Sequence, residues 1–304
     1  MLTRYKFEIL RFLEKNGLSK YTHRQLSDSL TISNAEITDD MTDLINEQLV
    51  NSSENGYLKI TQKGLSELEP YRVKKAIILA AGFGSRMMPA TKERPKPMVT
   101  VNGKRIIETL LDSLVQVGIK DITIIRGYKG QRFNELLSNY PFVKFINNEN
   151  FDKYNNISSA VLAKNTFIDG AYLCEADLYI SNPDVITKYQ YTSNILGSWS
   201  LETDDWSFKL DPYGHIINYQ KGNTYCWNYY GISYWTAEDC KKLNYDWDKY
   251  FSSKNGKDIF WEQVPLQLDS KNYQVEVRPC KKSDIIEIDN YYELAQLDSS
   301  YNVK

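Results

Sequence analysis

Cysteine and histidine are scarce among the 304 residues of this sequence, with four of the first and two of the second. The cysteines are scattered and form no CxxC pair, and His23 lies far from His215. Structural zinc sites need clustered ligands of these types, so the pattern argues against a zinc protein. Scattered thiols are typical of a reducing compartment, and we expect a cytoplasmic protein.

Long apolar runs are also missing. None approaches the roughly 20 residues that a membrane-spanning helix needs. The N-terminal stretch MLTRYKFEILRFLEKN interleaves charged and apolar residues, which predicts an amphipathic helix and not a signal peptide. The net charge is only −2, so the chain as a whole does not strongly attract nucleic acid or an anionic membrane.

The chain is predicted to divide into two unequal parts, residues 1–70 and residues 71–304. The first part has three helical segments, the second capped by Thr22 and the third by Ser33. Two short strands around a turn at 54–56 follow. Helix, helix, helix and hairpin is the order of a winged helix-turn-helix domain.

The charge of this first part argues against the DNA binding that such an order suggests. Residues 1–70 hold eight Lys and Arg against eleven Asp and Glu. The third helix, which would enter the groove, carries Glu36, Asp39, Asp40 and Asp43 and no Lys or Arg. Carboxylates oppose phosphates, so a packing, dimerisation or protein-contact role is favoured, and DNA binding stays open as the alternative.

Residues 71–304 alternate strands with helices. KKAIILAA, DITIIRG, VKFIN and AYLCEADLYI are predicted strands, and 106–116 is a predicted helix that ends before Gly118. Later segments, NILGSWS, FKLDPYGHIINYQ and NYYGISYW, are predicted antiparallel strands. The expected fold is α/β, a doubly wound, mixed but mainly parallel sheet of Rossmann-like type.

A glycine-rich stretch, AAGFGSRMMPATKERPKP, follows the first of these strands at residues 80–97. Gly82 and Gly84 allow backbone N–H groups to approach an anion, and Arg86 and Lys96 add positive charge. It is not a Walker A loop, and Met87 breaks the dinucleotide GxGxxG pattern. An ordinary strand-to-helix turn is the alternative for the GFG motif alone.

The longer string LAAGFGSRM…P…T…RPKPMVTVNGKRII resembles the signature of nucleotidyltransferases that couple an NTP to a phosphorylated small molecule. The resemblance extends from residue 75 to about residue 300. It implies that the loop wraps the triphosphate, that Arg86 steadies the β- and γ-phosphates, and that Lys96 contacts phosphate at the reacting centre.

Two acids fit a metal site in the same family. Asp177 ends the predicted strand AYLCEAD, and Asp289 ends IIEID. The resemblance implies that this pair holds Mg²⁺ against the α-phosphate, and two carboxylates plus substrate oxygens are enough for that ion. Helix capping by strand-end acids is the alternative for each residue alone.

All six tryptophans lie between residues 199 and 261. Trp206 stands in LETDDWSF, which we interpret as a polar, loop-like stretch, and Trp261 stands in GKDIFWEQ, again beside acids. Aromatic faces beside carboxylates favour a quaternary ammonium group. Core and surface packing is the alternative.

The segments NNENFDKYNNISSAVLAKN, CEADLYI and SDIIEIDN resemble bacterial phosphocholine cytidylyltransferases of the LicC type. The resemblance implies that CTP and phosphocholine give CDP-choline and pyrophosphate. It implies a choline site formed by Trp206, Asp258, Trp261 and Glu287. It implies nucleotide contacts from Ala80, Ala81, Gly82, Gly84, Ser85, Arg86, Tyr154, Asn155 and Asn156.

Several alternatives stay open at this point. A related enzyme could act on 2-aminoethylphosphonate or phosphoethanolamine, and a sugar-1-phosphate nucleotidyltransferase would share residues 75–100. A non-enzymatic, nucleotide-sensing DNA regulator is a third possibility. The first 70 residues have no counterpart in the minimal enzyme, and the sequence fixes neither the oligomeric state nor CTP over UTP.

Overall fold

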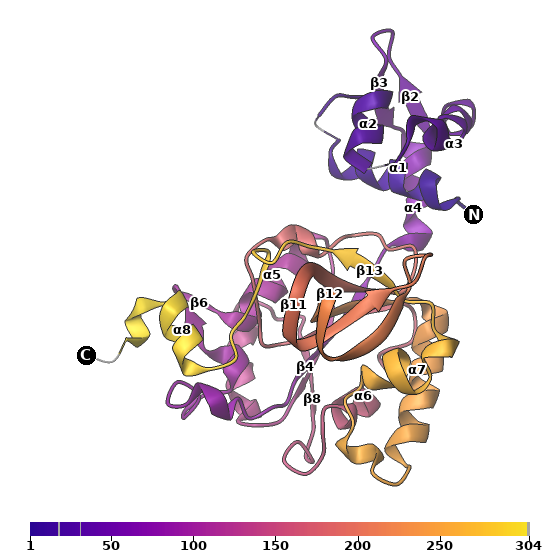
Figure 1. The fold of residues 1–304 in the computed structure, drawn as a ribbon. Coiled ribbons are helices and arrows are strands. Elements are labelled where there is room, and N and C mark those ends of the chain that lie inside the picture. The colour runs from indigo at the N-terminus through magenta and orange to yellow at the C-terminus, as the bar shows by residue number, and fades with distance from the viewer. Residues whose placement is uncertain (18, 31, 303–304) are drawn as a thin grey trace. The chain divides into compact units, whose positions relative to one another are not determined.

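The computed structural model describes residues 1–17, 19–30 and 32–302 of the chain (Figure 1). It contains two compact units. The first is formed by Met1–Arg72 together with the short segment Tyr189–Tyr191, and the second by Val73–Lys188 and Thr192–Lys304. No helix among the described residues is long and apolar enough to cross a membrane.

The first unit is helical with a small antiparallel sheet in the order β1-β3-β2. Its elements, in chain order, are α1 (Arg4–Lys15), β1 (Tyr21–Thr22), α2 (His23–Leu30), α3 (Asn34–Asn46), β2 (Val50–Ser52), β3 (Tyr57–Ile60), α4 (Gln62–Leu68) and the 3₁₀ turn η1 (Glu69–Tyr71). Three helices and a hairpin thus follow one another as expected from the sequence.

Side-chain caps fix the helix starts of this unit. The Thr3 hydroxyl accepts a hydrogen bond from the backbone N–H of Lys6 at the start of α1. At the start of α3, Ser33 and Glu36 form a reciprocal capping box, which confirms Ser33 as the cap. Such caps satisfy backbone donors that a helix leaves unpaired at its first turn.

Three residues from far along the chain complete the core of the first unit. Tyr189 is buried there, and its hydroxyl donates to Glu69 over 3.1 Å. Tyr191 stacks on Tyr71 with ring centroids 5.5 Å apart, and its hydroxyl donates to the backbone oxygen of Leu2. The unit therefore consists of two separate pieces of sequence.

The second unit carries most of the chain. Its helices and strands, in chain order, are β4 (Lys75–Ala80), β5 (Thr100–Val101), β6 (Lys104–Arg105), α5 (Ile106–Gln116), β7 (Asp121–Arg126), β8 (Lys144–Asn147), α6 (Ile157–Ala163), β9 (Ala171–Glu175), β10 (Leu178–Ile180), β11 (Asn194–Leu210), β12 (Ile216–Trp235), α7 (Ala237–Phe251), β13 (Glu276–Pro279), β14 (Ile285–Glu287) and α8 (Tyr291–Leu297). Its shorter turns are η2 (Ser85–Met87), η3 (Lys96–Met98), η4 (Gly130–Ser138), η5 (Pro183–Val185), η6 (Gly256–Asp258), the π-helical η7 (Val264–Leu268), η8 (Ser270–Asn272) and η9 (Ser299–Tyr301).

A seven-stranded sheet in the order β13-β11-β12-β9-β4-β7-β8 forms the centre of this unit. β4 runs parallel to both of its neighbours, β7 and β9, and β8 runs parallel to β7. β12 is antiparallel to β9 and to β11. The α/β fold with a mixed, mainly parallel sheet is confirmed.

Alternate residues of β4 face opposite layers, as the two-residue period of a strand requires. Ala76 and Ile78 belong to the core cluster that contains α5. Ile77 and Leu79 belong to the cluster that contains residues of α6 and α7. Helices therefore cover both faces of the sheet (Figure 1), so β4 is buried on both sides and its carboxyl end alone is free to hold a site.

One strand prediction and one loop prediction were wrong in detail. AYLCEADLYI does not form one strand: β9 ends at Glu175, and β10 starts at Leu178 and pairs with β14 outside the central sheet. The break places Asp177 in the short connection between β9 and β10. LETDDWSF is not a loop, because it belongs to the 17-residue strand β11, which pairs along its length with β12.

Candidate active site

The glycine loop leaves the carboxyl end of β4. Gly84 has a positive φ of 61°, and a Cβ at this position would lie 2.7 Å from the Cβ of Lys96. Only glycine allows this close approach. The loop leads into the 3₁₀ turn η2 and not into an α-helix, so any anion here is bound by loop backbone and side chains, not by the N-terminus of an α-helix.

Lys96 lies at the centre of a charged cluster. Its side chain is only 8% exposed, and its Nζ lies 3.1 Å from Oδ2 of Asp177 and 3.3 Å from Oδ1 of Asp289. Burial alone would lower the pKa of Lys96, but these two carboxylates outweigh it and the pKa is raised. Lys96 therefore stays charged, and the structure brings together three residues that the sequence predicts to act together.

Arg86 approaches the same cluster from η2. Its Nη1 lies 3.1 Å from Oδ2 of Asp289, and its side chain is otherwise largely exposed. Asp289 is thus shared between a buried cation and an exposed one. The exposed guanidinium keeps donors free for an incoming phosphate.

Glu287 completes an acidic group with Asp177 and Asp289. Carboxylate oxygens of the three residues lie within 4.8 Å of one another. Desolvation by the surrounding protein, followed by the charges of Asp177 and Asp289, raises the pKa of Glu287 to about 8. Three carboxylates at this spacing repel one another and favour a bound cation.

One cavity of about 950 Å³ joins the loop, the charged cluster and the aromatic region. Eight carboxylates and three cationic side chains line it. Its lining includes most residues predicted from the sequence, namely Ala80, Ala81, Gly82, Gly84, Ser85, Arg86, Lys96, Tyr154, Asn155, Asn156, Asp177, Trp206, Glu287 and Asp289.

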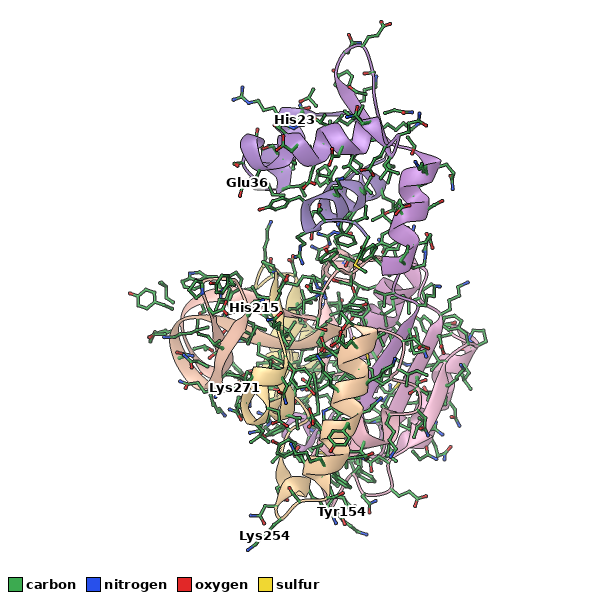
Figure 2. All side chains as sticks on the ribbon, turned by 90° about the vertical axis from the view of Figure 1, so that its right-hand side faces the viewer. His23, Glu36, Tyr154, His215, Lys254 and Lys271 are labelled. Atoms are coloured by element: carbon green, nitrogen blue, oxygen red, sulfur yellow. The ribbon has the colours of Figure 1, made fainter. Side chains whose placement is uncertain are left out.

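Asn155 and Asn156 connect this wall to the segment after α7. The Asn155 side chain donates to the backbone oxygen of Asp258 over 3.0 Å, and Asn156 Oδ1 accepts from the backbone N–H of Trp261 over 2.8 Å. Tyr154 lies beside the same segment (Figure 2), where it contacts Phe251. These contacts hold residues 257–261 against the cavity.

Asp258 and Trp261 are not on the cavity wall, contrary to the sequence prediction. Trp261 is fully buried in the core beside Trp235 and Trp247, and Asp258 is an exposed residue of η6. Their neighbours Phe260 and Glu262 line the cavity instead. The prediction selected residues that point away from the cavity. Adjacent residues of this segment point in opposite directions, so Phe260 and Glu262 face the cavity while Trp261 faces the core.

Trp206 does line the cavity, although it is on a strand and not in a loop. Its ring stacks on Tyr219, with centroids 4.8 Å apart, and contacts Phe260 edge-on at 6.0 Å. The ring is therefore held by its neighbours on one face and edge and is half-buried. This arrangement makes a rigid aromatic surface for a ligand.

Comparison with known proteins decides the family. The Nucleotidyl transferase family model matches residues 75–197. The chain is 35% identical over 228 residues to the 2-aminoethylphosphonate cytidylyltransferase of Lancefieldella rimae, across 74% of this chain and 92% of the relative. It is 31% identical to the choline-phosphate cytidylyltransferase of Streptococcus pneumoniae, across 74% and 96%.

The chain belongs to the nucleotidyl transferase family. The two relatives named above are cytidylyltransferases, and this chain is an enzyme of that kind. The solved CTP:phosphocholine cytidylyltransferase (LicC) of S. pneumoniae superposes with a TM-score of 0.68 at 28% identity, over 75% of this chain and 99% of that one.

Sequence reasoning missed two acids in the cavity of this nucleotidyl transferase, the half-buried Glu175 and the buried Glu262. Glu175 ends β9, and Glu262 follows Trp261; both line the cavity. The sequence did contain a signal for Glu262. A carboxylate within the mostly apolar stretch IFWEQVPL is expected to be buried, and a buried carboxylate usually has a binding partner. Nothing local distinguished Glu175 from Asp177.

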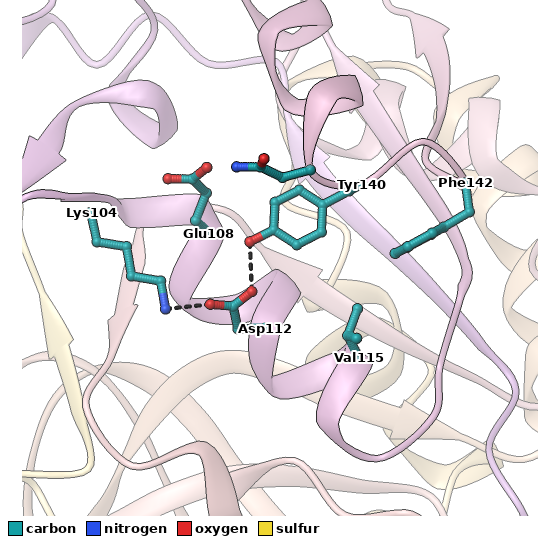
Figure 3. Close-up of a pocket in the computed structure, with 7 residues that line it drawn as sticks. Lys104, Glu108, Asp112, Val115, Tyr140 and Phe142 are labelled. Atoms are coloured by element: carbon teal, nitrogen blue, oxygen red, sulfur yellow. Dashed lines mark hydrogen bonds and ion pairs between the residues drawn. The ribbon is translucent and has the colours of Figure 1, made fainter.

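A second hollow of about 430 Å³ lies elsewhere in the second unit (Figure 3). Asp112 forms an ion pair with Lys104 there and accepts a 2.6 Å hydrogen bond from the hydroxyl of Tyr140. Its acids are thus already paired. None of its lining residues belongs to the active site.

Proposed function

We propose that this cytidylyltransferase joins CTP to a small acceptor that carries a phosphate or phosphonate at one end and a cationic nitrogen at the other. One observation carries the proposal: a single cavity combines the glycine loop and its cations with an acidic group and an acidic, aromatic wall. A nucleoside triphosphate suits the first part, and a cationic head suits the last.

The nucleotide is assigned to the loop side of the cavity. Backbone N–H groups of residues 80–85 would face the triphosphate, with Arg86 and Lys96 supplying charge. The base is assigned to the wall formed by residues 154–156, as the family resemblance implies.

Mg²⁺ fits the acidic group, because hard oxygen ligands at this spacing are what it prefers. Asp177 and Asp289 would hold it, and Glu287 is a third oxygen donor within reach. When bound, it would neutralise charge on the α-phosphate.

In the reaction, an oxygen of the acceptor's phosphate or phosphonate forms a bond to the α-phosphorus of CTP. The bond from that phosphorus to the bridging oxygen of the β-phosphate breaks, and pyrophosphate leaves with the electron pair. No covalent enzyme intermediate and no general base are needed, because the attacking oxygen is already ionised near neutral pH. The protein contributes position and charge, with Lys96 held beside Asp177 and Asp289.

Two acceptors of this class stand out. Phosphocholine is the acceptor expected from the sequence resemblance, and 2-aminoethylphosphonate is the acceptor in the name of a relative that is 35% identical. Phosphoethanolamine has the same cationic end as the latter. A sugar-1-phosphate lacks the positive charge that the acidic wall would neutralise.

The first unit is assigned no catalytic part. The winged-helix description of residues 1–70 stays a prediction, as does the role of this part of the chain as a packing, dimerisation or protein-contact module.

The decisive experiment measures pyrophosphate release with Mg²⁺ across CTP and UTP, each with phosphocholine, phosphoethanolamine, 2-aminoethylphosphonate and glucose-1-phosphate. Release with CTP and a cationic acceptor, and little with glucose-1-phosphate, is expected. Efficient use of glucose-1-phosphate or of UTP would overturn the proposal.

A further inference from the structure

Glu262 has an unpaired carboxylate oxygen in the wall of the active-site cavity. The residue is 3% exposed. Its Oε1 accepts a hydrogen bond from the Tyr219 hydroxyl over 3.3 Å, whereas the buried Oε2 has no hydrogen-bond partner among the described residues. A buried, unpaired acceptor of this kind is uncommon and points to a missing donor.

A second carboxylate, Glu175, lies close enough to act on the same ligand. Glu175 lines the same cavity as Glu262. Gly231 makes room for it, since a Cβ there would lie 2.2 Å from Oε2 of Glu175. Two carboxyl groups that face one cavity can pair with a cation bound between or beside them.

Aromatic side chains line the cavity beside these acids, together with Asn156, Asp177 and Glu287. The hydroxyl of Tyr229 is buried and also lacks a partner among the described residues, and the ring lies 5.4 Å from that of Tyr219. Burial, followed by the charges of Glu175 and Glu262, raises the pKa of Tyr229, so it stays an uncharged phenol. Its oxygen is a further acceptor in the same recess.

We infer that this recess, formed by Glu175, Glu262 and Tyr229, binds a primary ammonium group through its N–H bonds. The acceptor is therefore a 2-aminoethyl phosphonate or phosphate ester and not phosphocholine. The inference rests on the proposed function and names the acceptor within it. A primary ammonium has three donors for the unpaired acceptors, whereas a trimethylammonium has none.

The aromatic surface of Trp206 does not reverse this choice. A cation–π contact also forms with a primary ammonium, so the presence of Trp206 does not exclude one. Unpaired buried oxygen atoms do discriminate between substrates. A substrate whose ammonium group has no N–H bonds would leave these oxygens desolvated and without a hydrogen bond.

The test is a methylation series: phosphoethanolamine, its N-methyl and N,N-dimethyl derivatives, and phosphocholine, each with CTP and Mg²⁺. We expect kcat/KM to fall with each methyl group, by about a hundredfold or more over the series. 2-Aminoethylphosphonate measured in parallel separates the phosphonate from the phosphate ester, since both share the ammonium end. Equal or better use of phosphocholine overturns the inference but leaves the proposed function standing. No release with any acceptor overturns both.

Glu262→Gln assigns the effect to this residue. It keeps the size of the side chain but removes its charge, so the KM for phosphoethanolamine should rise at least tenfold while that for CTP changes less than twofold. The dependence on methylation should also flatten, which a purely structural role would not produce. Glu238→Gln, which removes an exposed carboxylate on α7, is the matched control and should behave as wild type. An unchanged methylation profile in Glu262→Gln would overturn the assignment. If this variant does not fold, the methylation series on the wild-type enzyme still tests the inference.

Discussion

The indole ring of Trp206 lies stacked on the phenol ring of Tyr219, with centroids 4.8 Å apart and planes 12° from parallel. The Tyr219 hydroxyl in turn donates to Glu262. One aromatic side chain of the cavity therefore supports another, which orients a buried acid. Loss of Trp206 should therefore loosen both Tyr219 and Glu262.

Trp206→Ala should raise the KM for the cationic acceptor about tenfold or more and that for CTP far less. The substitution removes an aromatic face beside the cation and the support of Tyr219, together worth about 2 kcal/mol. Steady-state kinetics measure this, provided that chemistry is slow relative to acceptor release. Trp199→Ala is the control, because Trp199 is on the same strand, 55% exposed, and does not line the cavity. An acceptor KM within twofold of wild type would remove Trp206 from the binding surface.

Asp177→Ala and Asp289→Ala should each nearly abolish turnover without unfolding the protein. Each contacts Lys96 and belongs to the acidic group, so its loss removes charge control at the α-phosphate, worth several kcal/mol at ~1.4 kcal/mol per factor of ten. Pyrophosphate release, with circular dichroism to check the fold, measures it. Asp169→Ala removes an exposed carboxylate outside the cavity and should keep the wild-type rate. A variant that retains more than a tenth of that rate would exclude its residue from the metal site.

Gly84→Ala should destabilise the protein, and Gly82→Ala should not. Alanine at 84 would keep a left-handed φ of 61° and would meet the Cβ of Lys96 at 2.7 Å, whereas a Cβ at 82 meets nothing within 4 Å. The left-handed conformation alone costs roughly 1–2 kcal/mol for a residue with a Cβ. Urea unfolding of both variants compares them directly, and equal stability of the two would contradict the packing of the loop on Lys96.

Glu262→Gln should stabilise the ligand-free protein at pH 8 more than at pH 5. Burial raises the pKa of Glu262 from 4.5 to about 7, and Glu175, Tyr219 and Tyr229 face it. Between these two pKa values the folded protein holds a proton that the unfolded chain has lost, so stability falls as pH rises through that window. Glutamine does not titrate, so the variant does not lose this stability. The increase in the free energy of unfolding relative to wild type should therefore be roughly 2 kcal/mol larger at pH 8 than at pH 5. The same gain at both pH values in urea unfolding would show that Glu262 does not titrate in this range.

The full chain should not bind DNA with useful affinity at physiological salt. In the first unit, Lys6 already pairs with Asp43 over 2.9 Å and with Glu47 over 3.0 Å, and α3 carries no Lys or Arg. Fluorescence anisotropy with random and selected duplexes measures it. Sequence-specific binding near 10⁻⁸ M, the usual range for such proteins, would refute this prediction.

Local patterns were enough to predict the sheet and the loop. β4 and α5 lie where the hydrophobic periodicity puts them, and the glycine loop that carries Arg86 and Lys96 starts at the carboxyl end of β4, where ligands of such sheets bind. These features depend on spacing along the chain, which a sequence displays directly.

The acceptor wall could not be predicted in the same way. Whether Trp261 or Phe260 faces the cavity depends on how Asn155 and Asn156 hold that segment, a contact across about 100 residues. Glu175 and Glu262 likewise meet only in the folded protein. Sequence composition indicated an acidic, aromatic region correctly but could not assign its inner and outer faces.

The positions of Tyr189 and Tyr191 determine what happens when the N-terminal residues are removed. The chain passes between the two units after Arg72, after Lys188 and after Tyr191, so removal of the first 72 residues would leave both tyrosines without Glu69, Tyr71 and the backbone of Leu2. A domain built from one continuous stretch at the end of a chain needs no residues from the rest of the chain to complete its core. Here residues 189–191 supply part of the core of the first unit, so a truncation after Arg72 would expose two aromatic side chains that are packed in the full chain.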